Sequence, residues 1–154
     1  MSIYFKHNPK YLIYSKSMEG GGLNNFDIIK IANYLRIPDF RGVFMRDTLP
    51  TKPHEKESGI VNFNTSKEPG SHWVAYYKDG TKRIYFDSFG QITPIEIQTY
   101  LKTNDEFTND DAVIERNTDI VQEPNTNICG HLCLYVLDKL SKGANFQDII
   151  NSLW

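Results

Sequence analysis

Apolar residues in the first third of the chain follow first a helical spacing and then a strand-like one. Positions 28, 31, 32 and 35 share one face of a helix predicted from Phe26 to Leu35, with Asn24 or Asn25 as its N-cap. Pro38 prevents this helix from continuing. The run from Phe40 to Met45 is then predicted to be a short strand.

Helical spacing returns in the second half of the chain. A helix is predicted from Pro94 to about Leu101, because proline suits the first helical position. Apolar positions 132, 133, 136, 137 and 140 predict an amphipathic helix from Cys129 to Leu140, which Gly143 is placed to cap. A final helix is predicted from about Phe146 to Leu153.

The middle of the chain is rich in aromatic and β-branched residues, which favour strands. Strands are predicted over 59–63, 72–77, 83–86 and 113–116. The turn Lys78-Asp79-Gly80 would join the second and third of these as a β-hairpin. Because helices and strands do not alternate regularly, the chain is predicted to be an α+β domain and not a doubly wound parallel sheet.

Composition indicates one globular domain of 154 residues, with 40% apolar and 23% charged positions. A net charge of −2 gives no general basis for binding nucleic acid or an anionic membrane. No run approaches the roughly 20 apolar residues that cross a bilayer, and the N-terminus lacks the apolar core of a secretory signal. Cys129 and Cys133 are too close for a disulfide framework, so a reducing, intracellular setting is expected.

Cys129 follows a polar loop and opens a predicted helix, where free N–H groups and the helix dipole favour the nucleophilic thiolate. Gly130 beside it would let backbone and substrate approach closely. Position alone leaves the alternative equally open, that Cys129 is a small core residue. Cys133, one turn later, is better explained by core burial beside Leu132 and Val136.

A thiolate nucleophile requires a histidine held within hydrogen-bond reach. His72 begins a hydrophobic strand, whose neighbours would fix the orientation of the ring. His7 lies in the N-terminal extension, His54 in a charged loop, and His131 on a different face of the helix that begins at Cys129. His72 is therefore the best candidate base, although a lone strand histidine is more often structural.

Two further residues fit the same chemistry. Asp87 closes the return strand of the hairpin, so it would lie near His72 and orient the imidazole; a strand-end aspartate is otherwise commonly a turn former. Gln122 precedes Cys129 by seven residues, and its amide could donate to a developing oxyanion together with the cysteine N–H. Without this context Gln122 would be interpreted as a plain loop residue.

The order of these residues resembles that of the adenain family of viral maturation cysteine peptidases, and it is similar to SUMO- and ubiquitin-like-protein proteases of the same clan. Ser71–Ala75 (SHWVA) matches the histidine motif, Phe86–Gly90 (FDSFG) the acid motif, and Cys129–Leu134 (CGHLCL) the nucleophile motif. Phe40–Asp47 (FRGVFMRD) looks most like the proteases of virophages and Maverick/Polinton elements. With Gln122, the match covers most of residues 23–142.

The resemblance implies a mixed central β-sheet flanked by helices, with the nucleophile at the N-terminus of a central helix. It implies Cys129 as nucleophile, His72 as general base and acid, Asp87 as its orienter and Gln122 as oxyanion donor, with no cofactor. The implied activity is that of a cysteine endopeptidase.

Substrate contacts are implied for Trp73 and Gly130. An indole that narrows the channel leaves no room for side chains, which gives the family's preference for Gly-Gly before the cut a steric cause. The implied substrates are capsid and other virion precursors, cleaved in the virion or at the viral assembly site in the host cytoplasm or nucleus.

The chain departs from the adenovirus pattern in two places. Adenovirus enzymes more often have Glu at the position of Asp87, where cellular relatives have Asp. They also take an activating peptide through a disulfide to an earlier cysteine, and no cysteine precedes Cys129. Covalent activation is therefore not expected, a non-covalent peptide activator stays open, and the net charge does not support DNA as a cofactor.

Residues 1–22 are predicted to be an N-terminal extension and residues 23–154 the peptidase domain. The segment Met18-Glu19-Gly20-Gly21-Gly22 resembles the family's preferred cleavage site, which predicts self-processing between Gly21 and Gly22. The alternative is that three glycines form an ordinary flexible linker.

The sequence leaves two other functions open. The chain could be a deconjugating protease for ubiquitin-like modifiers, which uses the same machinery on a different substrate surface. It could also be a catalytically inactive binding domain on the same fold, although the presence of all four catalytic residue types argues against this. The short length and the Phe40–Asp47 run favour the viral interpretation.

Overall fold

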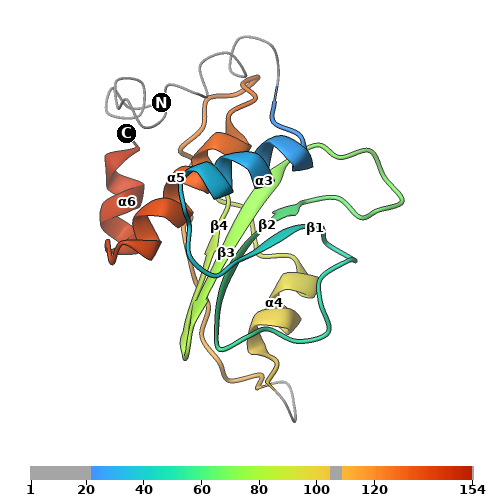
Figure 1. Ribbon diagram of the computed structural model, residues 1–154, viewed down its shortest axis with the longest axis vertical. Helices are drawn as coiled ribbons and strands as arrows, with labels where there is room; N and C mark the ends of the chain where they lie inside the picture. The colour runs from blue at the N-terminus through green and yellow to red at the C-terminus, as the bar shows by residue number, and fades with distance from the viewer. Residues whose placement is uncertain (1–21, 105–108, 154) are drawn as a thin grey trace.

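A five-stranded mixed sheet forms the centre of the protein in a computed structural model that describes residues 22–104 and 109–153 (Figure 1). The strand order β1-β2-β3-β4-β5 follows the chain, with β1 parallel to β2, β4 parallel to β5, and the two central pairings antiparallel. The strands are β1 (Phe40–Met45), β2 (Lys56–Asn62), β3 (Trp73–Asp79), β4 (Lys82–Phe86) and β5 (Glu115–Arg116).

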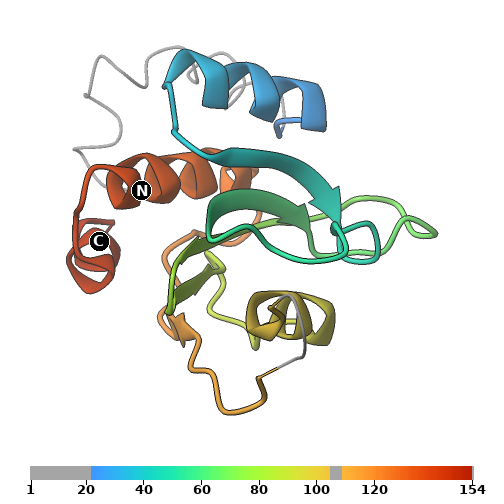
Figure 2. The same cartoon turned by 60° about the horizontal axis from the view of Figure 1, so that its bottom comes forward.

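Helices cover both faces of this sheet. Figure 2 shows α3 and α5 on one face and α4 on the other. The helices are α3 (Asn25–Tyr34), α4 (Ile95–Lys102), α5 (Cys129–Ser141) and α6 (Phe146–Ser152), and α6 packs against α5. No helix in the described ranges is both long and apolar enough to cross a membrane.

Two hydrophobic cores form because both faces of the sheet are covered, which explains the nearly continuous apolar runs in its central strands. Ile60 and Ala75 face α3 and α5, while Val61 and Val74 face α4. Helix α5 is almost completely buried, and its first residue is Cys129. The fold therefore places the N-terminus of a buried central helix against the end of the sheet.

Helix α3 begins with a capping box, which fixes how the chain enters the domain. The Asn24 side chain accepts from the Asp27 N–H at 2.8 Å, and the Asp27 carboxylate accepts from the Asn24 N–H at 3.1 Å. Such a cap contributes about 1 kcal/mol. Of the two N-caps predicted, Asn24 is the one observed.

The predicted α+β class and mixed sheet are confirmed, and every predicted helix and strand is present. The predicted turn at positions 78–80 is wrong, because Lys78 and Asp79 belong to β3 and pair with β2 and β4. The turn is formed by Gly80 and Thr81, with Gly80 at φ 62°, a conformation that favours glycine. Pro94 is the N-cap of α4 and not its first helical residue.

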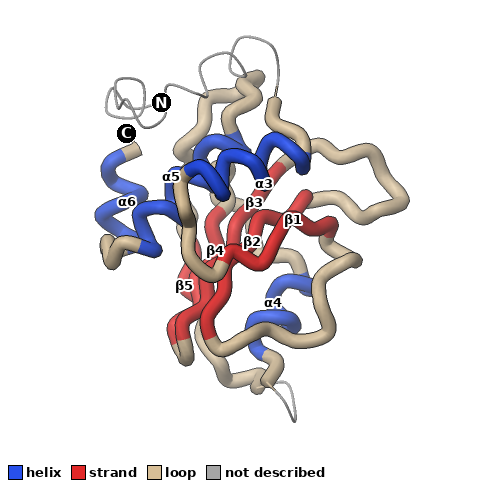
Figure 3. The backbone as a smooth tube through the Cα atoms, in the orientation of Figure 1, coloured by secondary structure: helices blue, strands red, loops and turns tan. Residues whose placement is uncertain are grey.

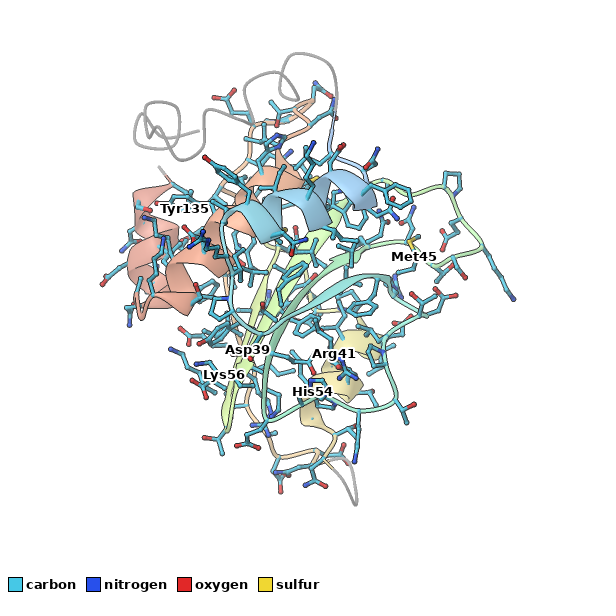
Figure 4. All side chains as sticks on the ribbon, viewed as in Figure 1. Asp39, Arg41, Met45, His54, Lys56 and Tyr135 are labelled. Atoms are coloured by element: carbon cyan, nitrogen blue, oxygen red, sulfur yellow. The ribbon has the colours of Figure 1, made fainter. Side chains whose placement is uncertain are left out.

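A buried polar cluster ties the loop before β2 to the sheet and to α4. The Glu57 carboxylate, 1% exposed, accepts from the Arg41 guanidinium at 2.9 Å, the Tyr76 hydroxyl at 2.5 Å and the Tyr100 hydroxyl at 2.9 Å. It also accepts from the backbone N–H of His54 at 2.6 Å. Figure 4 shows Arg41 and His54 near α4, and Met45 lies apart from them near the start of α3.

Candidate active site

Four segments meet at one end of the sheet: the start of β3, the end of β4, the loop before α5 and the start of α5 (Figure 3). Cys129 is the first residue of α5 and is 8% exposed. Its Sγ accepts from the backbone N–H of Trp73 at 3.5 Å. Because the first N–H groups of a helix have no partner within it, this position also favours negative charge on the sulfur.

His72 lies immediately before β3 and is hydrogen-bonded to Asp87. The distance from His72 Nε2 to Asp87 Oδ1 is 2.7 Å, and Asp87 is completely buried. The backbone carbonyl of His72 accepts from the Phe63 N–H at 2.7 Å, which extends the β2–β3 pairing to this residue. With Nε2 bound to the carboxylate, Nδ1 is the ring nitrogen that can face Cys129.

Charge interactions at this site favour an ion pair between Cys129 and His72. Burial lowers the pKa of His72, but hydrogen bonds to Asp87 and Cys129 and their negative charges outweigh it and raise this pKa to about 9. Burial raises the pKa of Cys129, but hydrogen bonds from His72, Trp73 and Gly130 and the charge of His72 lower it overall. Thiolate and imidazolium therefore coexist over a range of pH that ends near 9.

Two phenylalanines flank the His72 ring. The ring centroid of Phe89 is 4.9 Å from that of His72, and the centroid of Phe63 is 6.2 Å away. The Phe89 N–H also donates to Asp87 Oδ1 at 2.8 Å. Neither phenylalanine was predicted to act at the site; Phe89 lies within the acid motif, while no sequence signal pointed to Phe63.

Gln122 lines the same cavity as Cys129, and its amide is held at both ends. Its Oε1 accepts from the Ser88 hydroxyl at 2.5 Å, and its Nε2 donates to the carbonyl of Thr126 at 2.8 Å and to the Thr126 hydroxyl at 3.0 Å. Since a carbonyl can only accept, the –NH₂ group must face Thr126. An –NH₂ group has two N–H donors, so donation to an oxyanion would compete with the bonds to Thr126.

A groove passes over Cys129 and consists of two adjoining cavities that share Ser71, Asn127 and Cys129. The larger cavity has a volume of about 590 Å³, and the smaller one about 300 Å³. The larger is lined by Gly22, Leu23, Asn24, Asn25, Val43, Phe44, Met45, Thr48, Asn62, Gly70 and Trp73, and the smaller by Phe63, His72, Phe89, Gln91, Gln122 and Thr126.

Trp73 forms part of the wall of the larger cavity. Its indole N–H donates to the Leu23 carbonyl at 2.9 Å. A Cβ on Gly130 would meet the indole at 3.3 Å and the Leu23 side chain at 3.5 Å. The missing side chain of Gly130 thus makes room for Trp73 and Leu23, and a direct contact of Gly130 with substrate stays a prediction.

The predicted self-cleavage site falls at the edge of the structure. Gly22 lines the larger cavity, and a Cβ at this residue would be 3.6 Å from Asn127. Gly21 and the rest of the extension lie outside the described residues. Cys133 is buried in the core as expected, and among the described residues no group of three His, Cys, Asp or Glu side chains could hold a metal ion.

No family model and no curated protein matches the sequence. Among solved structures, the fold is similar to that of the ASFV pS273R protease, with a TM-score of 0.60 and 13% identity over 96% of this chain. A Se-Met form of that protease gives a TM-score of 0.57 and 15% identity over 94% of this chain. This chain spans 65% of the length of each. The likeness shows that this chain shares the fold of the ASFV pS273R protease.

Proposed function

We propose that this protein is a cysteine endopeptidase with Cys129 as nucleophile and His72 as its base. The observation that carries the proposal is the buried His72–Asp87 hydrogen bond beside a cysteine that opens a helix and faces a groove. A cysteine with a lowered pKa in a substrate-sized groove is the requirement for thiol-dependent acyl transfer.

The proposed reaction follows from the positions of these groups. The Cys129 thiolate attacks the scissile carbonyl, and the His72 imidazolium gives its proton to the leaving amine. Loss of the amine leaves the acyl group on Cys129 as a thioester and His72 neutral. His72 then takes a proton from water, the hydroxide attacks the thioester carbonyl, and the C–S bond breaks to give the acid product and restore the Cys129 thiolate beside the His72 imidazolium. The backbone N–H of Cys129 and an N–H of Gln122 stabilise the oxyanion in both steps.

The groove supports a substrate segment that is small and uncharged near the cut. Every residue that lines the larger cavity carries an uncharged side chain, apart from Cys129 itself when ionised. Trp73 and Cys129 both line this cavity, and the indole is fixed by its bond to Leu23, which supports the inference that glycines are preferred beside the sulfur. We infer cleavage after Gly-Gly sites in capsid or other virion precursors, as the adenain-type resemblance implies.

Two substrates test this proposal. A Leu-x-Gly-Gly peptide reporter should be cleaved by the wild-type protein and not by Cys129→Ala. An intact ubiquitin-like protein fused to a C-terminal reporter serves as the competitor substrate. Strong cleavage of the folded fusion with poor cleavage of the peptide would replace the viral assignment with deconjugation. Absence of cleavage of both would leave the inactive binding domain.

We propose in addition that the chain cleaves itself between Gly21 and Gly22. Leu23 is 5% exposed and its carbonyl accepts from the Trp73 indole N–H, so any movement of this segment that cleavage within one molecule requires would cost that burial and that hydrogen bond. Cleavage between molecules avoids this cost and should depend on protein concentration. Intact masses over time, compared with Cys129→Ala, test the proposal; retention of residues 1–21 by the active protein at every concentration would refute it.

A further inference from the structure

Asn117, just after β5, is hydrogen-bonded to both polar groups of the Asp87 backbone. Its Oδ1 accepts from the Asp87 N–H at 3.1 Å, and its Nδ2 donates to the Asp87 carbonyl at 2.6 Å. Asp87 lies just beyond the end of β4. The Asn117 amide therefore makes the two backbone hydrogen bonds that a neighbouring strand would otherwise make. Asn117 is 5% exposed, so these bonds are shielded from water.

The Asp87 carboxylate depends on this backbone support. Oδ1 accepts from His72 and from the Phe89 N–H, whereas Oδ2 is buried and receives no hydrogen bond from the part of the chain that the structure describes. Only one oxygen therefore orients the carboxylate directly. The position of the Asp87 backbone therefore sets the rest of the orientation of the carboxylate.

The turn that follows Asp87 is fixed by the same segment. The Gly90 N–H donates to the Asp87 carbonyl at 2.8 Å, and Gly90 has a φ of 64°. A Cβ on Gly90 would lie 2.5 Å from the Thr118 carbonyl oxygen, so the turn and the segment after β5 are in direct contact. The Asn117 Nδ2 also donates to the Asp119 carbonyl at 3.1 Å, which holds that segment in place.

We propose that Asn117 is a positioning residue that holds Asp87 in the orientation required to keep His72 charged beside Cys129. The catalytic consequence rests on the proposed peptidase function, whereas the effect on the Cys129–His72 pair does not. Loss of the Asn117 amide lets Asp87 move relative to His72. The imidazolium is then less stabilised, and Cys129 ionises at a higher pH.

The test measures the rate at which iodoacetamide alkylates Cys129 as a function of pH, which requires no substrate. Cys133 is 0% exposed and does not compete in the folded protein. The full-length Asn117→Ala variant should show its alkylation midpoint at a higher pH than the wild type. With the peptide reporter, kcat should fall on the order of 10- to 100-fold while KM changes less than about two-fold.

Asn145→Ala is the matched control, because Asn145 caps α6 by accepting from the Asp148 N–H at 3.2 Å and is not part of the groove. It should lower the melting temperature without moving the alkylation midpoint. Where Asn117→Ala does not fold, Asn117→Ser adds no charge and is too short to bond both backbone groups of Asp87. An unchanged midpoint in a folded Asn117 variant overturns the proposal. A shifted midpoint in a protein that cleaves neither reporter supports the proposal and refutes the peptidase function.

Discussion

Replacing Asp87 by Asn gives the most direct test of the charge relationships at the candidate active site. The substitution keeps the size of the side chain but removes the negative charge that stabilises the His72 imidazolium. An asparagine amide can also donate to Nε2, which would leave the proton of a neutral ring on Nδ1, the nitrogen that should face Cys129. Both effects act against the thiolate–imidazolium pair.

The size of the effect follows from the pKa of His72. The rise from 6.5 to about 9 corresponds to about 3 kcal/mol of stabilisation of the charged ring, net of the opposing effect of burial. The hydrogen bond to Asp87 is the largest contribution that raises this pKa. If Asp87 supplies most of the stabilisation, its loss should lower kcat/KM at neutral pH on the order of 30- to 150-fold.

The direction of the pH effect is also fixed. In the wild type, kcat/KM should fall above about pH 9, where His72 loses its proton. In Asp87→Asn, burial still lowers the His72 pKa and only Cys129 is left to oppose it, so the alkaline limb should move from about pH 9 toward lower pH. The pH dependence of cleavage of the Leu-x-Gly-Gly reporter measures this shift, with Asp148→Asn in α6 as a control for the loss of one carboxylate.

Two results would refute the reasoning. An alkaline limb that stays near pH 9 in a folded Asp87→Asn variant would show that the carboxylate does not set the charge of His72. A loss of activity equal to that of His72→Ala would show that Asp87 does more than orient and charge a ring that remains present.

Three further substitutions test other parts of the structure. Gly130→Ala should raise KM for the Gly-Gly peptide several-fold, because the new Cβ pushes Trp73 into the groove. The same substitution should stabilise α5 by up to about 1 kcal/mol through helix propensity. An unchanged KM would contradict the tight contact between Gly130 and Trp73. Ser88→Ala should lower kcat on the order of 10-fold, because the Gln122 carbonyl loses its donor and the orientation of the amide is no longer fixed; wild-type kcat would exclude this role. Glu57→Gln should lower the free energy of unfolding, measured by urea titration, by about 3 kcal/mol, because it removes the charge that Arg41 and the two tyrosine hydroxyls bind. The kcat per folded molecule should not change. A stability equal to that of the wild type would exclude a supporting role for the buried cluster.

The strands and helices could be predicted from the sequence because both faces of the sheet are buried, which gives its central strands long apolar runs. The strand from Phe40 to Met45 and the start of α5 at Cys129 were predicted at the positions observed. The hairpin turn was misplaced because Asp79-Gly80 has strong turn chemistry. Pairing with Lys56 and Lys82 instead keeps Asp79 in the strand, and a local pattern does not contain that information.

The candidate site also contains some residues that the sequence predicted and others that only the structure revealed. The sequence predicted His72, Asp87, Gln122 and Cys129 as site residues because each chemical role requires one residue type at the end of a predictable element. The structure places them at one end of the sheet, and their catalytic roles stay predictions. The residues that hold them were not found: Asn117 and Ser88 act through hydrogen bonds to residues 30 and 34 positions away in the chain.

The sequence by itself therefore determined the α+β class, the order of the elements and which residue types could carry thiol chemistry. Only the tertiary structure decided that His72 Nε2 lies 2.7 Å from Asp87 Oδ1, that the Gln122 amide is held between Ser88 and Thr126, and that Leu23 and Trp73 form part of the wall of the larger cavity. The physical reason is the separation along the chain of the residues that interact. Helix and strand propensities depend on neighbours along the chain, whereas charge stabilisation and groove shape depend on contacts between distant segments, which exist only once the chain has folded.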